Sequence, residues 1–144
     1  MNVITCYHIG KHFATPRAIG YTDGWVPSPN PDIKEIQDQD SSGIAMVDRR
    51  TIQPYGLLHG GVSVVLAETL GSCGAAFSCP EGFRAVGLDI NANHIRGVTA
   101  GWVTGTARPV HIGRTTQVWH IDLHNEAGGL TCVSRITMAV QAER

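Results

Sequence analysis

The sequence predicts an α+β fold in which one long helix packs against a curled antiparallel sheet. Residues 60–76 contain no proline and are mostly small and apolar around one acid, Glu68, which is typical of a buried helix. Strand-like segments joined by glycine-containing turns follow this run. Consecutive strands with short connections favour an antiparallel sheet, and the helix would form the second layer. The chain of 144 residues is expected to be a single domain.

The amino-terminal part of the chain predicts little regular structure. Prolines and glycines interrupt residues 1–30 and disfavour a long helix there. Tyr21 and Trp25 are expected to cover an apolar edge. Residues 32–48 contain two apolar groups separated by the polar run 37–43, a pattern that favours a hairpin.

Four strands are expected after the helix. In the first, Val86, Leu88 and Ile90 fall on one face and alternate with polar residues on the other. Pro109 interrupts the second and predicts an edge position or a bulge. The last three follow one another through short turns and therefore predict an antiparallel meander. The expected strands are residues 85–95, 102–112, 117–124 and 130–140.

Composition excludes several classes of function. The formal net charge is −1 and 16% of residues are charged, so no basic surface for nucleic acid is expected. The apolar run is too short and too interrupted to span a bilayer, and the first fifteen residues lack the apolar core of a signal peptide. Four cysteines form no C-x-x-C pair, which favours reduced thiols in the cytoplasm. His120 and His124 lie four residues apart, but their segment is strand-like, so we expect no metal there, and no cofactor is expected for this chain.

The start of the predicted helix offers a first chemical element. Several backbone N–H groups at a helix start lack partners, and the helix dipole is positive there. Gly60 and Gly61 have no side chain to block approach, so a carbonyl oxygen could bind these donors as in an oxyanion hole. The alternative is that the two glycines only allow tight packing.

Glu68 is the second chemical element. A lone carboxylate in an apolar helix is costly unless it is paired, protonated or used, although it could also reach solvent at one edge. Glu68 lies about two turns after Gly61, on the same face and roughly 10 Å along the axis. One substrate carbonyl cannot easily touch both groups, whereas two antiparallel helices from two subunits would bring them together. Ser72 and Thr69 lie nearby, and back-bonding within the helix is expected for Thr69.

Residues 48–140 resemble the hotdog-fold acyl-CoA thioesterases, and most closely the bacterial aromatic group that hydrolyses 1,4-dihydroxy-2-naphthoyl-CoA and hydroxybenzoyl-type thioesters. The matching motifs are QPYGLLHGGVSVVLAETLGS at 53–72, VGLDINANHIR at 86–96 and PVHIGRTTQVW at 109–119. The resemblance implies a long helix wrapped by the sheet, in a dimer that pairs into a homotetramer. It places the core at residues 48–144, while residues 1–47 depart from the family pattern.

The resemblance also implies roles for individual residues. Glu68 would be the nucleophile or the general base, and the Gly60 N–H with the Gln53 side chain would polarise the thioester carbonyl. His59 would position the thioester or the leaving thiol, and Ser72 would help to hold the acyl group or water. Arginine suits phosphate, as expected at two of the positions that would bind the CoA arm. These positions are Gly87, His94, Ile95, Arg96, Gly97, His111, Ile112, Gly113, Arg114, Thr115 and Thr116.

Three functions are compatible with this resemblance. The first is hydrolysis of an aromatic acyl-CoA to the free acid and CoA, with 1,4-dihydroxy-2-naphthoyl-CoA of menaquinone biosynthesis as the expected substrate. The second is a proofreading thioesterase that releases misacylated aryl groups from an acyl carrier protein. The third is a non-catalytic acyl-CoA-binding module, which Glu68 disfavours. A hotdog dehydratase would need an Asp/His pair placed differently.

Overall fold

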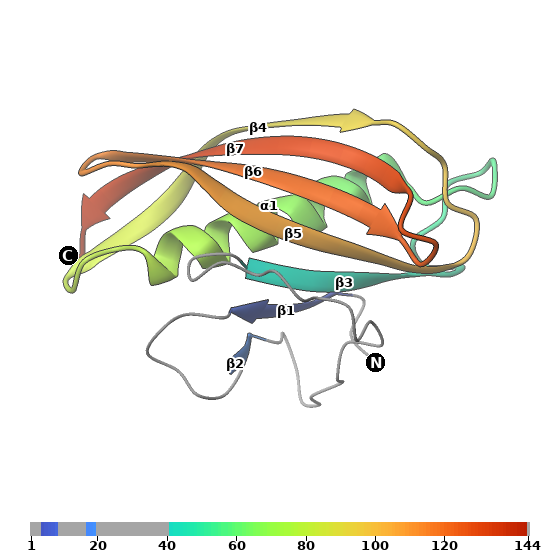
Figure 1. Ribbon diagram of the computed structural model, residues 1–144, viewed down its shortest axis with the longest axis horizontal. Coiled ribbons are helices and arrows are strands. Elements are labelled where there is room, and N and C mark those ends of the chain that lie inside the picture. The colour runs from blue at the N-terminus through green and yellow to red at the C-terminus, as the bar shows by residue number, and fades with distance from the viewer. Residues whose placement is uncertain (1–3, 9–16, 20–40, 144) are drawn as a thin grey trace.

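The computed structural model describes residues 4–8, 17–19 and 41–143. One helix and seven strands make up this part of the chain (Figure 1). The strands form one antiparallel sheet in the order β2-β1-β3-β5-β6-β7-β4. The elements are β1 (Ile4–His8), β2 (Arg17–Ile19), β3 (Ser41–Val47), α1 (Gly60–Phe77), β4 (Phe83–His94), β5 (Gly101–Ile112), β6 (Thr116–Asn125) and β7 (Leu130–Ala142).

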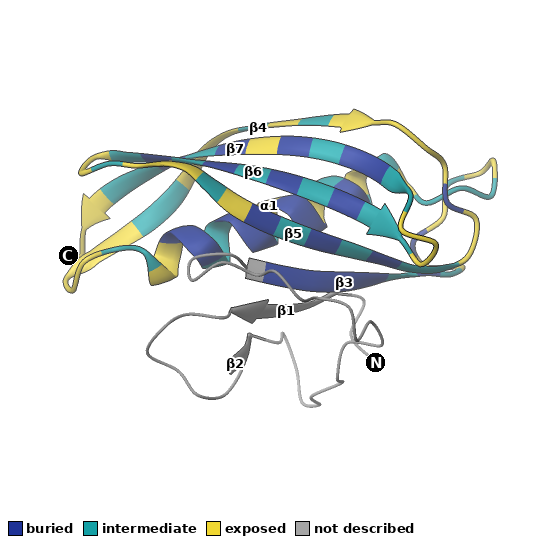
Figure 2. Cartoon of the chain, in the orientation of Figure 1, coloured by how far each residue is buried: buried dark blue, intermediate teal, exposed yellow. Residues whose placement is uncertain are grey.

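The sheet curls around α1, and the core lies between them (Figures 1 and 2). Leu66 and Leu70 of α1 and Trp119 and Ile121 of β6 are at most 1% exposed. Small residues let the helix approach the sheet, because a Cβ placed on Gly74 would lie 2.6 Å from Cζ3 of Trp119. The expected fold, a long helix wrapped by an antiparallel sheet, is confirmed.

The predicted elements after residue 59 are found close to their expected bounds. The last three strands form the meander, and β5 and β6 shift register between Pro109 and His111, so the bulge predicted from Pro109 is confirmed. The sequence did not predict that β4 pairs with β7 and forms one edge of the sheet. It also missed β1 and β2. Residues 20–40, which include Tyr21, Trp25 and the whole first arm of the predicted 32–48 hairpin, lie outside the described residues. Residues 41–43, expected in the turn of that hairpin, belong instead to β3 and pair with β1.

Two expectations about buried faces are wrong in the single chain. Helix α1 is not buried all round, because Gly61, Val65 and Glu68 form an exposed stripe on the side away from the sheet. Its mean hydropathy of 1.3 would suit a membrane span, but its other face packs on the sheet as the core helix of a globular fold does. Leu88 does not share a buried face with Val86, because a register shift between Gly87 and Asp89 leaves it 63% exposed.

Candidate active site

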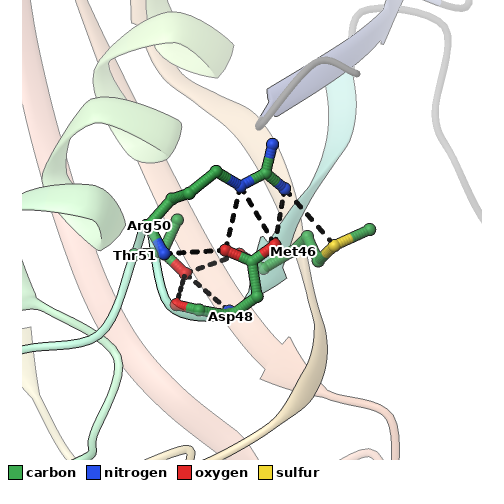
Figure 3. Close-up of polar contacts among 4 residues, drawn as sticks. All are labelled: Met46, Asp48, Arg50 and Thr51. Atoms are coloured by element: carbon green, nitrogen blue, oxygen red, sulfur yellow. Dashed lines mark hydrogen bonds and ion pairs between the residues drawn. The ribbon is translucent and has the colours of Figure 1, made fainter.

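A hydrogen-bonded turn leads from β3 toward the helix (Figure 3). The Arg50 guanidinium donates from Nε to both carboxylate oxygens of Asp48 at 3.0 Å, and this bonding lowers the pKa of Asp48 to about 2. The Thr51 hydroxyl is buried; it donates to the Met46 carbonyl at 2.9 Å and accepts the Asp48 N–H at 2.8 Å. These bonds fix the direction in which the chain leaves the sheet.

A small hairpin then carries Gln53 to the start of α1. The His59 N–H donates to the Thr51 carbonyl at 2.8 Å, and the Gln53 N–H donates to the Leu57 carbonyl at 2.8 Å. Gly56, with φ of 76°, closes the hairpin in a conformation that favours glycine. The Leu58 N–H donates to the carbonyl of Val98 at 2.7 Å, which joins the hairpin to the segment after β4. The Gln53 backbone is therefore held across the hairpin from the helix start.

The first turn of α1 presents one unengaged backbone donor. His59 is the N-cap residue, and its Nδ1 accepts the Gly61 N–H at 2.9 Å. Gly61 is therefore already used, whereas the Gly60 N–H has no acceptor among the described residues. The imidazole of His94 lies against Gly60, since a Cβ on that glycine would be 2.8 Å from Nε2. Gly60 is the better candidate for binding a carbonyl oxygen, and the bond to Nδ1 leaves the Nε2–H of a neutral His59 free to donate.

Glu68 lies two turns further along the exposed stripe of α1. Its carboxylate is exposed and has no hydrogen-bond or ion-pair partner within the described part of the chain. A Cβ on Gly87 of β4 would be 3.9 Å from Oε1 of Glu68, so the acid stands beside the β4 bulge. Ser72 is half-buried one turn later. The Thr69 hydroxyl donates to the Val65 carbonyl at 2.6 Å, so the expected back-bonding of Thr69 is confirmed.

One chain does not bring these groups into one site. Glu68 follows Gly60 by eight residues, which is about 12 Å along a helix axis. An ester carbonyl bound at Gly60 is therefore out of reach of the carboxylate of the same chain. The chain supplies an oxyanion-binding half and a carboxylate half, with the two halves separated along one helix.

The residues expected to bind CoA are also divided. His94, Ile95, Arg96 and Gly97 lie with the helix start, where Leu57 packs against Gly97. The segment 111–116 forms the β5–β6 turn at the opposite end of the sheet (Figure 1). Strand β6, ten residues long, separates this turn from the β6–β7 turn, a distance of about 30 Å. Gly87 belongs to neither group and lies beside Glu68.

Sequence reasoning missed two features next to these residues. Leu88, the extra residue of the β4 bulge, lies next to Gly87, and no sequence signal distinguished it from an ordinary strand residue. Gly129 lies against the guanidinium of Arg96, and the sequence showed it only as part of a glycine-containing turn. Both the bulge at Leu88 and the contact of Gly129 with Arg96 depend on how the strands pair, which sequence periodicity does not predict.

Comparisons with known proteins converge on one activity. A family model described as the Thioesterase superfamily matches residues 55–132. The 1,4-dihydroxy-2-naphthoyl-CoA hydrolase of Escherichia coli is 49% identical over 108 residues, which are 74% of this chain and 79% of the relative. A proofreading thioesterase of Cronobacter turicensis is 48% identical over 94 residues, which are 65% of this chain and 69% of the relative. The crystal structure of a thioesterase from Haemophilus influenzae has a TM-score of 0.72 at 49% identity and covers 75% of this chain and 76% of its own.

Proposed function

The chain belongs to the thioesterase superfamily and is a thioester hydrolase, and from this we propose that it hydrolyses an aromatic acyl-CoA to the free acid and CoA. The observation that carries the proposal is the pair of unengaged groups on α1, the Gly60 N–H at the helix start and the exposed Glu68 carboxylate. A donor for a carbonyl oxygen and a carboxylate base or nucleophile are what thioester hydrolysis requires. No metal or redox cofactor enters this chemistry.

Each group has a defined task in the proposed reaction. The Gly60 N–H, with the Gln53 side chain, binds the thioester carbonyl oxygen and stabilises the negative charge that develops on it. Glu68 attacks the carbonyl carbon or removes a proton from the attacking water. The Nε2–H of His59 donates toward the thioester or the leaving thiolate, because its Nδ1 already accepts the Gly61 N–H. Ser72 holds the acyl group or the water one turn beyond the acid.

The complete site is formed by two chains. Strand β4 is an edge of the described sheet, and much of it is exposed (Figure 2). It carries Leu88, which is 63% exposed, and it packs beside α1, where Val65 is 51% exposed. A free edge with an exposed apolar side chain beside it favours pairing with a second copy. Pairing across a two-fold axis sets the two α1 helices antiparallel, so the Gly60 of one chain faces the Glu68 of its partner. Residues 94–97 and residues 111–116, which lie far apart in one chain, would then reach the same CoA molecule from two different chains.

We expect the active protein to be at least a dimer, and a homotetramer if two such dimers associate. The reason is that a folded monomer of 15.4 kDa would hold two separated halves of a site. Light scattering coupled to size exclusion measures the mass directly. A peak of single-chain mass that retains full specific activity would rule out the shared site.

The substrate is proposed from the relatives. The name of the Escherichia coli relative specifies 1,4-dihydroxy-2-naphthoyl-CoA, which would place this chain in menaquinone biosynthesis in the cytoplasm. The name of the Cronobacter turicensis relative specifies a proofreading thioesterase. We take this as support for the second candidate, in which the chain would release aryl groups from a carrier protein.

A kinetic panel decides between these substrates. The panel contains naphthoyl and hydroxybenzoyl groups, each carried by CoA and by an acyl carrier protein, with thiol release as the measured signal. We expect kcat/KM to be highest for the naphthoyl-CoA ester. A clear preference for the carrier-protein esters would favour the proofreading function, and hydrolysis of none of them would refute the proposal.

A further inference from the structure

The β6–β7 turn holds Gly129 in a fixed place. The Gly128 N–H donates to the Asn125 carbonyl at 2.9 Å, and the Asn125 N–H donates to the Gly129 carbonyl at 3.0 Å. The Gly129 N–H donates to the Asn125 side-chain carbonyl at 2.8 Å. Three hydrogen bonds with good distances therefore close the turn and determine where Gly129 lies.

The two consecutive glycines of this turn meet different demands. Gly128 has φ of 75°, a left-handed conformation, and a Cβ on it would meet nothing within 4 Å. The φ of Gly129 lies outside the left-handed region, so its backbone accepts other residues. A Cβ on Gly129 would instead overlap Nη1 of Arg96 and lie 3.3 Å from Cζ. A side chain at position 129 would therefore displace the guanidinium from the place that it occupies beside this glycine.

The backbone of Arg96 is hydrogen-bonded to the neighbouring strand β7. The N–H groups of Ile95 and Arg96 both donate to the Thr131 carbonyl, at 2.8 and 3.2 Å. The Arg96 side chain is exposed and has no carboxylate partner among the described residues. The acid of the same turn, Glu126, lies elsewhere, since its Oε2 would be 2.7 Å from a Cβ on Gly101. The backbone of Arg96 is therefore held in place, and its cation is not neutralised by any carboxylate of the described residues.

We infer that Gly129 is a positioning residue. It leaves the space in which the Arg96 guanidinium lies, so that the guanidinium can bind the phosphates of the CoA arm. The inference rests on the proposed function, because it takes a CoA thioester as the substrate. An arginine side chain has several rotatable bonds, and ordering it costs free energy at the moment of binding. Contact with Gly129, which has no side chain, orders the planar guanidinium before CoA binds. The free-energy cost of ordering the side chain on binding is then smaller. A side chain at position 129 would fill the space beside Gly129 that the guanidinium occupies, but it would leave the positive charge of Arg96 in the chain.

The test uses the full chain and two substrates with the same aromatic acyl group. One is the CoA ester and the other is the N-acetylcysteamine ester, which lacks the phosphates. We expect Gly129→Ala to raise KM for the CoA ester several-fold, toward the roughly tenfold increase expected for Arg96→Ala from loss of a charge-assisted hydrogen bond. The kcat for both esters and the KM for the short ester should stay within about twofold of wild type, because the remote arm binds alike in ground and transition states.

Double variants separate this role from a structural one. In the Arg96→Ala background, Gly129→Ala should add nothing to KM, because the residue it displaces is gone. In the Arg96→Lys background its effect should be smaller than in wild type, because an ammonium has no planar fork to seat. Equal increases in KM in all three backgrounds, or for both esters, would overturn the inference, as would an unchanged KM in Gly129→Ala. If the wild type hydrolysed no aromatic acyl-CoA at all, the proposed function would fail instead.

Discussion

Replacing Glu68 by glutamine is expected to lower kcat by at least about a hundredfold, the lower end of what a positioned acid or base contributes. The amide keeps the size of the side chain but can neither attack the thioester nor take a proton from water. The carboxylate has no partner among the described residues, so its loss removes no hydrogen bond seen in the chain. Stability and ground-state binding should therefore change little. Single-turnover hydrolysis of a naphthoyl- or hydroxybenzoyl-CoA measures the effect on the chemical step.

Two further variants sharpen this result. Glu68→Asp withdraws the carboxylate by one methylene and should fall between wild type and the glutamine variant. Glu81→Gln makes the same chemical change at an exposed turn beyond α1 and should leave kcat unchanged. Near-normal turnover by Glu68→Gln would remove the acid from the mechanism.

Gly60→Ala is expected to have the second largest effect on kcat, also about a hundredfold, which is the loss typical of one oxyanion-hole donor. The added Cβ would lie 2.8 Å from Nε2 and 3.1 Å from Cε1 of His94, so the imidazole must move and the carbonyl must bind further from the N–H. Alanine favours the helix, so the melting temperature should not fall much. Steady-state kinetics with circular dichroism of the same samples checks both parts. A variant with wild-type kcat would contradict the expected displacement of the carbonyl oxygen from the Gly60 N–H.

Much of the fold followed from local patterns in the sequence. The proline-free apolar run predicted α1, and alternation predicted β6, whose residues 117, 119, 121 and 123 are buried while their neighbours are half-buried. Pro109 predicted either an edge position or a bulge in β5, because proline cannot donate to a strand pair, and the structure shows the bulge. These features depend on residues near one another in the chain, so periodicity and turn chemistry are sufficient to find them.

Features that depend on pairing between distant segments could not be predicted. The edge position of β4 and the bulge that exposes Leu88 depend on the register with β7. The contact of His94 with Gly60 joins the end of β4 to the start of α1, and that of Arg96 with Gly129 joins residues of two different strand ends. The spacing of Gly61 and Glu68 did predict that the start of the helix and the acid lie about two turns apart in one chain, because a helix has a fixed rise per residue.

Mixing the two defective chains tests the shared site most directly. Glu68→Gln and Gly60→Ala chains are co-expressed in equal amounts, so that about half of the dimers contain one of each. In such a dimer one site combines both intact groups and the other combines both defects. We predict about a quarter of the wild-type activity, whereas each parent alone retains about a hundredth. An activity no higher than the mean of the two parents would show that each site lies within one chain and would contradict the account.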